Sequence, residues 1–234
     1  QGGESILIHG GASGIGSHAI QVARVLGARV AVTAGAPAKL ELCAGLGAEV
    51  LIDYRADDFV ERVHRATEGR GADLVLDVMG ASYLERNLAA LAPGGRLVII
   101  GMQGGVKAQV NLGTLIGKRL TVLGTALRSR PVDGPHGKAA IVDAVVQSVW
   151  PMLDSARVRP VIGARYPIDR AGEAHRALAA GETYGKVLLV IELPDSGRRE
   201  PTLAPATPAP DPGGRPRRPR HPSARRLPAL GHPQ

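Results

Sequence analysis

Short apolar runs alternate with helix-forming segments along most of this chain, and this alternation limits the folds open to it. Segments with apolar residues at helical spacing separate most of the runs, and residues 138–153 predict a long helix after the sixth run. Strands joined by helices of this length form parallel βαβ units with right-handed crossovers. The sequence therefore predicts an α/β fold with a doubly wound, six-stranded Rossmann sheet in the order 3-2-1-4-5-6. The strands are expected at residues 5–9, 28–33, 49–53, 73–78, 96–100 and 120–123.

Two further parts follow the expected Rossmann domain, which we assign to residues 1–156. The first is residues 157–193, which either extend the sheet or belong to a second domain. The second is a tail, residues 194–234, of different composition. Within the first part, the pattern predicts a strand at 161–168, a helix at 169–180 and a strand at 186–192.

The tail accounts for most of the positive charge. The whole chain has a formal net charge of +8, and residues 194–234 carry eight arginines against three acidic residues. They also hold 11 of the 18 prolines and almost no large apolar residues, so they cannot bury enough surface to offset the entropy of ordering. We predict a disordered, Arg/Pro-rich tail. A basic tail can bind nucleic acid, but we favour a solvated extension without a nucleic-acid partner.

The single cysteine, Cys43, excludes a disulfide scaffold, a Cys-rich zinc site and an iron–sulfur cluster. The seven histidines show no metal-ligand spacing, so we expect no metal site. No apolar run approaches the roughly 18 residues of a membrane span. No basic stretch leads into an apolar one at the N-terminus, as a signal peptide requires. We therefore expect a cytoplasmic protein without a membrane partner.

The turn after the first predicted strand has the strongest chemical signature, and it reads GGASGIGS over residues 10–17. Aligned on the dinucleotide fingerprint, Gly11, Gly14 and Gly16 take glycine positions, and Ser13 replaces the middle glycine. Small residues here let the backbone approach a pyrophosphate, and the following helix offers free N–H groups to the anion. We expect a dinucleotide site. A P-loop is excluded, because no Gly-Lys-Ser/Thr follows.

The end of the second predicted strand indicates which dinucleotide binds. An NAD site places an acidic residue there, bonded to the ribose hydroxyls, whereas residues 32–36 contain none. Lys39, one turn into the next helix, could pair with a 2′-phosphate or be a solvated surface lysine. Tyr54, after the third strand, could pack beside the adenosine ribose-phosphate or be an ordinary loop tyrosine. We favour NADPH over NADH.

Six separate motifs carry a family resemblance: GGASGIG at 10–16, TAGAPAKL at 33–40, DYRADDF at 53–59, DLVLDVMG at 73–80, YLERNLAALAPGGRLVIIG at 83–101 and KRLTVLGTALRSR at 118–130. Together they resemble the NADPH-dependent quinone oxidoreductases. These are zinc-independent members of the medium-chain dehydrogenase/reductase superfamily, which is similar to zinc-binding alcohol dehydrogenases. The resemblance spans about residues 3–193. It implies direct hydride transfer from NADPH to quinones, enones or similar electron-poor alkenes, without a metal.

The resemblance also implies roles for individual residues, although it identifies no catalytic residue. The sixth strand would pair across a two-fold axis to form a homodimer, through Leu120–Leu123. The 2′-phosphate would lie between Gly35 and Lys39, with Tyr54 at the same end. The pyrophosphate would be held by Ser13, Gly14, Ile15 and Gly16. The nicotinamide would be lined by Ile100, Gly101, Met102 and Gln103.

Two departures from the family pattern keep an alternative open. Family members carry a GroES-like substrate domain before the first Rossmann strand, whereas this chain begins almost at that strand. We expect a truncated form in which strands 161–168 and 187–192, remnants of that domain, lack partners. The tail is the second departure. The alternative is a non-catalytic NADPH-binding module, with nucleic-acid affinity from the tail. Short-chain dehydrogenases share such a glycine-rich turn, but their Tyr-x-x-x-Lys pair is absent.

Overall fold

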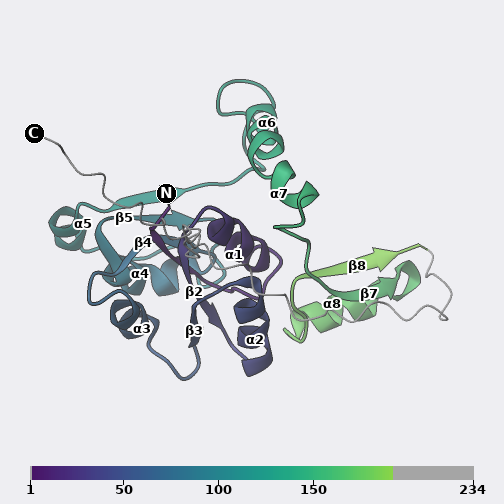
Figure 1. Cartoon of the computed structure of the whole chain (residues 1–234), viewed down its shortest axis with the longest axis horizontal. Helices are drawn as coiled ribbons and strands as arrows, with labels where there is room; N and C mark the ends of the chain where they lie inside the picture. The colour runs from purple at the N-terminus through teal and green to yellow at the C-terminus, as the bar shows by residue number, and fades with distance from the viewer. Residues whose placement is uncertain (1, 192–234) are drawn as a thin grey trace, which may run out of the picture.

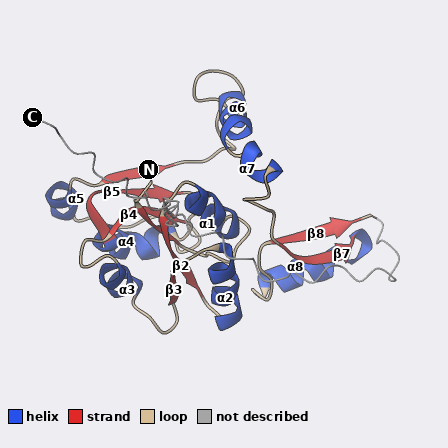
Figure 2. Ribbon diagram, viewed as in Figure 1, coloured by secondary structure: helices blue, strands red, loops and turns tan. Residues whose placement is uncertain are grey.

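The computed structural model of the chain describes residues 2–191, and its largest element is a six-stranded parallel sheet (Figure 1). The strands lie in the order β3-β2-β1-β4-β5-β6, so the predicted fold class and strand order are confirmed. Figure 2 shows these strands in red among blue helices. The strands are β1 (Ser5–Ile8), β2 (Arg29–Ala34), β3 (Val50–Asp53), β4 (Ala72–Asp77), β5 (Leu91–Ile99) and β6 (Thr121–Gly124).

Helices cover both faces of the sheet. Two of them, α1 and α2, contribute to an apolar core on one face, and α3 and α4 contribute to a second core on the other. A short 3₁₀ turn, η1, precedes α4. The bounds are α1 (Gly16–Val25), α2 (Pro37–Leu46), α3 (Phe59–Ala66), η1 (Gly80–Tyr83) and α4 (Leu84–Ala90).

Side-chain alternation along the strands supplies both cores. In β1, Ile6 and Ile8 belong to the core beside α1 and α2, whereas Leu7 belongs to the core beside α3 and α4. This follows from the two-residue period of a strand. Because parallel strands are covered on both faces, they appear in a sequence as continuous apolar runs. That is why the runs locate the strands.

Two helical regions differ from the sequence-based expectations. The sequence analysis does not predict α5 (Leu112–Lys118), a helix of seven residues of which none is fully buried, although Leu115 packs against the core beside α3 and α4. The predicted helix at 138–153 is two helices, α6 (Lys138–Ser148) and α7 (Trp150–Asp154). Pro151 lies at the start of α7, where a residue without an N–H is tolerated but cannot continue the preceding hydrogen-bond ladder.

The strand–helix–strand piece forms a unit of its own, to the right of α2 in Figure 1. Its strands, β7 (Ile162–Pro167) and β8 (Lys186–Val190), pair in parallel as a two-stranded sheet. The 3₁₀ turn η2 (Ile168–Arg170) and α8 (Ala171–Ala179) connect them. The expectation that these strands lack partners is wrong, because they pair with each other. They do not extend the large sheet.

Buried contacts fix the chain that leads into β7 against α1. Gln21, on α1, donates from Nε2 to the carbonyl oxygen of Arg159 (3.0 Å) and accepts at Oε1 from the Arg159 N–H (2.9 Å). Val158 and Val161 are buried on either side, and Val161 belongs to the core beside α1 and α2. The β7–α8–β8 unit is therefore anchored to the helix that follows the glycine-rich turn.

The predicted disordered tail, residues 194–234, lies outside the described residues. The domain boundaries at residues 156 and 193 stay predictions. No helix between residues 2 and 191 has the length and apolar character of a membrane span.

Candidate functional site

The glycine-rich turn connects β1 to α1 at the carboxyl edge of the sheet. In the sheet, β1 lies between β2 and β4. The chain moves outward from β1 through β2 to β3, and then returns to the other side of β1 as β4. A strand with this position marks the switch point, where doubly wound sheets open a crevice beyond the strand ends.

Close contacts explain two of the glycines in this turn. A Cβ on Gly11 would lie 2.8 Å from Cβ of Val32 and 3.0 Å from the sulfur of Cys43. A Cβ on Gly16 would lie 2.3 Å from the carbonyl oxygen of Gly10. Only a residue without a side chain leaves both contacts unstrained, so α1 can lie directly against the turn.

Ser13, in the middle glycine position, caps the start of α1. Its Oγ accepts from the Gly16 N–H at 3.0 Å, and its carbonyl oxygen accepts from the Ser17 N–H at 2.9 Å. Within residues 2–191, the N–H of Ile15 has no acceptor. The first turn of α1 contains no acidic residue. The helix N-terminus therefore offers a free donor and partial positive charge, which suits an anion.

The end of β2 and the start of α2 form the second part of the site. Gly35 is buried, and a Cβ there would lie 2.4 Å from the hydroxyl oxygen of Tyr54, so the phenol lies directly against Gly35. Ala36 begins α2 without a side-chain cap, and the first turn of α2 contains no acidic residue. Lys39 donates from Nζ to the carbonyl oxygen of Gly181 at 2.6 Å.

A pocket of about 250 Å³ opens between these two parts. It brings together Ser13, Gly14, Gly35, Lys39 and Tyr54, five of the residues that the sequence analysis singles out. Among the described residues that line it, none is acidic and Lys39 is the one charged side chain. Such a lining suits an anionic ligand. The complete lining is Gly10, Ala12, Ser13, Gly14, Ala34, Gly35, Lys39, Tyr54, Leu178, Gly181, Thr183, Tyr184 and Gly185.

Three other predicted residues lie below or beside this pocket. Gly11 and Gly16 are buried beneath the turn, where they set its shape and do not face the cavity. The side chain of Ile15 is exposed beside the turn. Its backbone N–H, and not its side chain, is the group that could reach a ligand.

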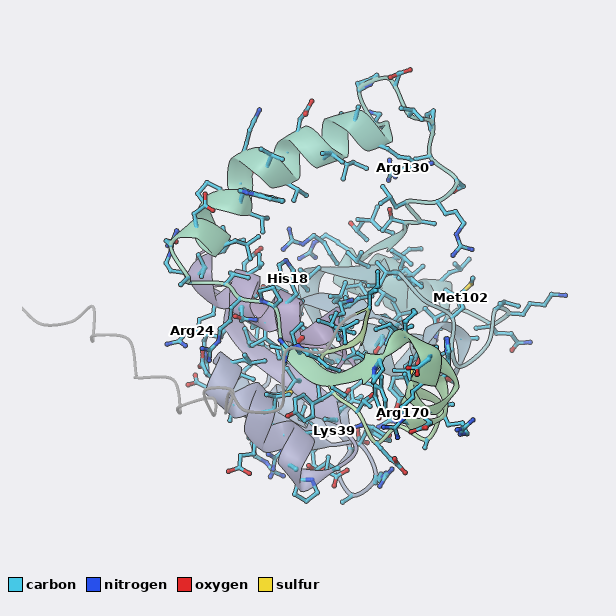
Figure 3. All side chains as sticks on the ribbon, turned by 90° about the vertical axis from the view of Figure 1, so that its right-hand side faces the viewer. His18, Arg24, Lys39, Met102, Arg130 and Arg170 are labelled. Atoms are coloured by element: carbon cyan, nitrogen blue, oxygen red, sulfur yellow. The ribbon has the colours of Figure 1, made fainter. Side chains whose placement is uncertain are left out.

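The predicted nicotinamide segment, 100–103, follows β5 and does not line the pocket. Its Ile100 N–H donates to the carbonyl oxygen of Asp77 (2.8 Å), and its Gln103 N–H donates to that of Val78 (3.2 Å). The segment is therefore fixed to the end of β4, further along the same carboxyl edge. Figure 3 shows Met102, which is exposed, well apart from Lys39.

The sequence analysis missed one wall of the pocket. Residues from the 178–185 range, which runs from the end of α8 to the start of β8, form this wall. Gly185 donates its N–H to the carbonyl oxygen of Ala12 (2.8 Å) and pairs with Ser13 in an isolated parallel bridge. Figure 3 shows Lys39 where α2 meets this green C-terminal unit. No local pattern reveals the wall, because a tertiary contact brings it to the turn.

Arg55 is a second residue that the sequence analysis missed. Its guanidinium carbon lies 5.9 Å from the centroid of the Tyr54 ring, within the range of a cation–π contact. Its guanidinium therefore lies next to a ring that lines the pocket, although Arg55 itself is not part of the lining. The available signal was its position, directly after Tyr54 in the motif at 53–59.

His9 is a buried structural residue below the turn and does not line the pocket. It is 2% exposed, with Nε2 at 2.8 Å from Oδ1 of Asn87 and Nδ1 at 3.1 Å from Oγ1 of Thr33. Its ring packs edge-on against Phe59 and Tyr83. Burial lowers the pKa of His9, so the ring is neutral at pH 7 and braces the β1 end through hydrogen bonds.

Comparison with known proteins places this geometry in a family. Residues 14–141 match the family model described as zinc-binding dehydrogenase. A quinone oxidoreductase of Pseudomonas aeruginosa is 32% identical over 191 residues, which are 81% of this chain and 57% of that protein. The chain spans 55% to 57% of the length of this and the mammalian quinone oxidoreductases first matched.

Two solved structures of quinone oxidoreductases have a fold similar to that of this chain. The Thermus thermophilus quinone oxidoreductase, solved also in complex with NADPH, has a TM-score of 0.70 and 34% identity, covering 81% of this chain and 59% of that one. The Escherichia coli quinone oxidoreductase complexed with NADPH has a TM-score of 0.70 and 29% identity, covering 81% and 58%. These matches confirm the resemblance seen in the motifs. The chain belongs to the zinc-binding dehydrogenase family, and it corresponds to the nucleotide-binding part of the quinone oxidoreductases of the medium-chain dehydrogenase/reductase superfamily.

Proposed function

We propose that the chain binds NADPH in the pocket between the β1–α1 and β2–α2 turns, as the nucleotide-binding part of an oxidoreductase that reduces quinones or enones. One observation supports this proposal most directly. A single pocket brings together five of the predicted residues, and among the described residues that line it none is acidic: Ser13, Gly14, Gly35, Lys39 and Tyr54. The related quinone oxidoreductases solved with NADPH support the same assignment. A cytoplasmic location belongs to this proposal and rests on composition alone.

Each end of the pocket suits a different part of NADPH. At the β1–α1 turn, the free Ile15 N–H suits the pyrophosphate, and Gly14 adds no side chain of its own. At the β2–α2 turn, Lys39 suits the 2′-phosphate as a point charge, and the Tyr54 hydroxyl can donate to it. Within residues 2–191, no carboxylate lines the pocket to repel that phosphate. The segment 100–103, at the end of β5, remains the predicted nicotinamide contact.

The residues of this chain bind and orient the cofactor. Bound NADPH supplies the hydride, which is chemistry that the protein itself does not provide. Fixing the dinucleotide at both phosphates holds its reactive end over the carboxyl edge of the sheet, and such positioning lowers the barrier by removing orientational freedom before reaction. The family description names zinc. Among residues 2–191, no three His, Cys, Asp or Glu side chains are grouped to hold a metal ion. Hydride transfer without a metal stays a prediction.

The cofactor assignment is tested by the ratio of NADH to NADPH dissociation constants. Lys39→Ala should lower this ratio about tenfold, because a charge-assisted hydrogen bond to the 2′-phosphate is lost while NADH has no such group. Calorimetric titration of the full chain with each cofactor measures it. Lys138→Ala, on α6, is the matched control and should leave the ratio unchanged. An unchanged ratio in Lys39→Ala would make Lys39 a bystander.

The reductase assignment is tested separately, because binding does not imply turnover. Steady-state oxidation of NADPH by the full chain with 1,4-naphthoquinone should exceed that of heat-denatured protein. Tight NADPH binding without enzyme-dependent oxidation would instead support the alternative, a non-catalytic NADPH-binding module. This chain spans only 57% of the length of the Pseudomonas aeruginosa relative, so cofactor binding and turnover have to be measured separately.

The homodimer also belongs to the proposal. Among the described strands, β6 pairs with β5 alone, and Val122 and Leu123 are 41% and 49% exposed. An apolar edge with unpaired backbone groups tends to be paired or covered. Leu120 differs from its neighbours, because it precedes β6 and packs against the core beside α3 and α4. Light scattering should give twice the chain mass at micromolar concentration, and Val122→Pro should reduce it by removing a ladder donor. A monomeric unmodified chain would contradict the dimer, and a dimer that survives Val122→Pro would place the interface elsewhere.

A further inference from the structure

A buried carboxylate holds the loop that follows β4, residues 78–82, which we call the β4 loop. Asp77, the last residue of β4, is 0% exposed. Its Oδ1 accepts from the Met79 N–H at 2.8 Å, and its Oδ2 accepts from the Gly80 N–H at 2.9 Å. Hydrogen bonds to a carboxylate are stronger than those between neutral groups. Asp77 does not line the pocket of the proposed function, so its effect on that site would pass through the β4 loop.

The β4 loop is paired with the segment that follows β5, residues 100–105, which we call the β5 segment. Besides the contact of Ile100 with the Asp77 carbonyl, four backbone hydrogen bonds join the two. With the N–H donor first and the carbonyl acceptor second, they are Gln103 to Val78 (3.2 Å), Gly104 to Met79 (2.7 Å), Ala81 to Gly105 (3.0 Å) and Ser82 to Gly104 (3.2 Å). Two of the four run in each direction. The conformation of the β4 loop therefore determines where the β5 segment lies.

The two pieces are also in direct contact at Gly80. This residue has a φ of +73°, and a Cβ there would lie 2.8 Å from the carbonyl oxygen of Gly105 and 3.0 Å from Cα of Met102. A side chain at position 80 would push the β5 segment away. The N–H that Oδ2 of Asp77 binds thus belongs to the residue that lies closest against the segment.

The strand order places these two pieces on the opposite side of β1 from Lys39. In the sheet, β2 lies on one side of β1, and β4 and β5 lie on the other. A dinucleotide bound at a switch point extends across it. In the proposed function the adenosine half lies at the β2–α2 turn. The nicotinamide half would therefore reach the ends of β4 and β5.

Given the proposed NADPH site, on which this step rests, we infer that Asp77 is a positioning residue for the nicotinamide. Its carboxylate fixes the β4 loop, and the β4 loop holds the β5 segment against which the nicotinamide lies. In Asp77→Asn, one carboxylate oxygen becomes an NH₂ group, which cannot accept a hydrogen bond. Either the Met79 N–H or the Gly80 N–H then loses its acceptor, and the β5 segment is held less firmly.

Two ligands separate the halves of the cofactor: NADPH, and adenosine 2′,5′-bisphosphate, which lacks the nicotinamide half. In calorimetric titrations of the full chain, Asp77→Asn should weaken NADPH binding about tenfold. It should leave the affinity for adenosine 2′,5′-bisphosphate unchanged. Asp58→Asn is the matched control and should change neither affinity, because Asp58 binds the Val60 N–H (2.8 Å) at the start of α3.

The fluorescence of bound NADPH gives a readout that a merely structural role would not change. At saturating NADPH, Asp77→Asn should show weaker nicotinamide emission than the unmodified chain, because the ring is held less rigidly. A residue that only stabilised the fold would leave the emission of cofactor already bound unchanged.

Amide hydrogen exchange of the unmodified chain tests the inference without any variant. At saturation, NADPH should slow exchange at Met79 and Gly80 more than adenosine 2′,5′-bisphosphate does, because only NADPH brings a nicotinamide to the paired pieces. Equal protection by the two ligands would overturn the inference. If Asp77→Asn does not fold, this comparison decides alone.

The possible failures are distinguishable. If Asp77→Asn binds NADPH with the affinity and emission of the unmodified chain, Asp77 does not position the nicotinamide, and the proposed site still stands on Lys39. If Asp77→Asn weakens adenosine 2′,5′-bisphosphate as much as NADPH, Asp77 supports the whole domain and the inference is wrong. If the unmodified chain binds neither ligand at millimolar concentration, both the proposed function and this inference are overturned.

Discussion

Replacing Gly16 by alanine tests whether close contact between α1 and the preceding turn holds the site together. A Cβ at this position would lie 2.3 Å from the carbonyl oxygen of Gly10 and 2.7 Å from Cα and the carbonyl oxygen of Gly11. These atoms are all backbone, so no flexible side chain can move aside. The start of α1 must shift by roughly 1 Å to reach ordinary van der Waals distance. Overpacking of this kind costs about 1–3 kcal/mol, a large part of the roughly 5–15 kcal/mol that stabilises a domain.

Gly45→Ala is the matched control. Gly45 lies in α2, and a Cβ there would meet no atom within 4 Å outside the backbone of its own helix. This change should therefore raise the free energy of unfolding by about 0.5–1 kcal/mol, through helix propensity. Urea unfolding followed by circular dichroism measures both variants, and a parallel titration measures NADPH affinity. Gly16→Ala should lose stability and NADPH affinity together. A Gly16→Ala protein as stable as Gly45→Ala would refute the close-contact explanation of this glycine.

Three further predictions concern the surroundings of the site. Burial lowers the pKa of His9 below its ordinary value of 6.5, so the unfolded chain takes up the proton more readily than the folded chain. The stability that neutral His9 contributes is therefore present above about pH 6.5 and is lost as the pH falls below that value. The unfolding free energy of His9→Gln should fall less between pH 7.5 and pH 5, and parallel pH profiles would show that His9 is not the cause. Gln21→Met should cost about 1–3 kcal/mol, since it leaves the N–H and carbonyl of Arg159 without their partner; an unchanged urea midpoint would show that this anchor is dispensable. Deleting residues 194–234 should leave the melting temperature and NADPH affinity unchanged, and a large drop in melting temperature would contradict the composition argument.

The sheet could be predicted from the sequence because each strand leaves a local mark. The run from Ile6 to Ile8 is apolar on both faces, since a central parallel strand meets a core on each side. The glycine-rich turn is equally local, because a strand, a tight turn and a helix follow one another within a few residues. The failure at α5 comes from its length. Leu112, Leu115 and Ile116 follow helical spacing and Asn111 caps the helix, but seven residues are too few to establish a helical period.

The site could be predicted only in part, and for a related reason. Gly14, Lys39 and Tyr54 each follow a parallel strand, so a topology that places the strand ends side by side also places these residues together. The wall formed by residues 178–185 depends on a contact between Gly185 and the first turn, which lie far apart in the sequence. No local motif connects the two, so only the folded chain brings them together.

The most direct test of the central claim is a calorimetric titration of the unmodified full chain with NADPH and with NADH under the same salt and pH. At the end assigned to the 2′-phosphate, the described part of the chain gives the pocket a lysine and no carboxylate. The chain should therefore bind NADPH more tightly than NADH, by about tenfold. Equal affinities, or a preference for NADH, would contradict the assignment of this pocket to NADPH.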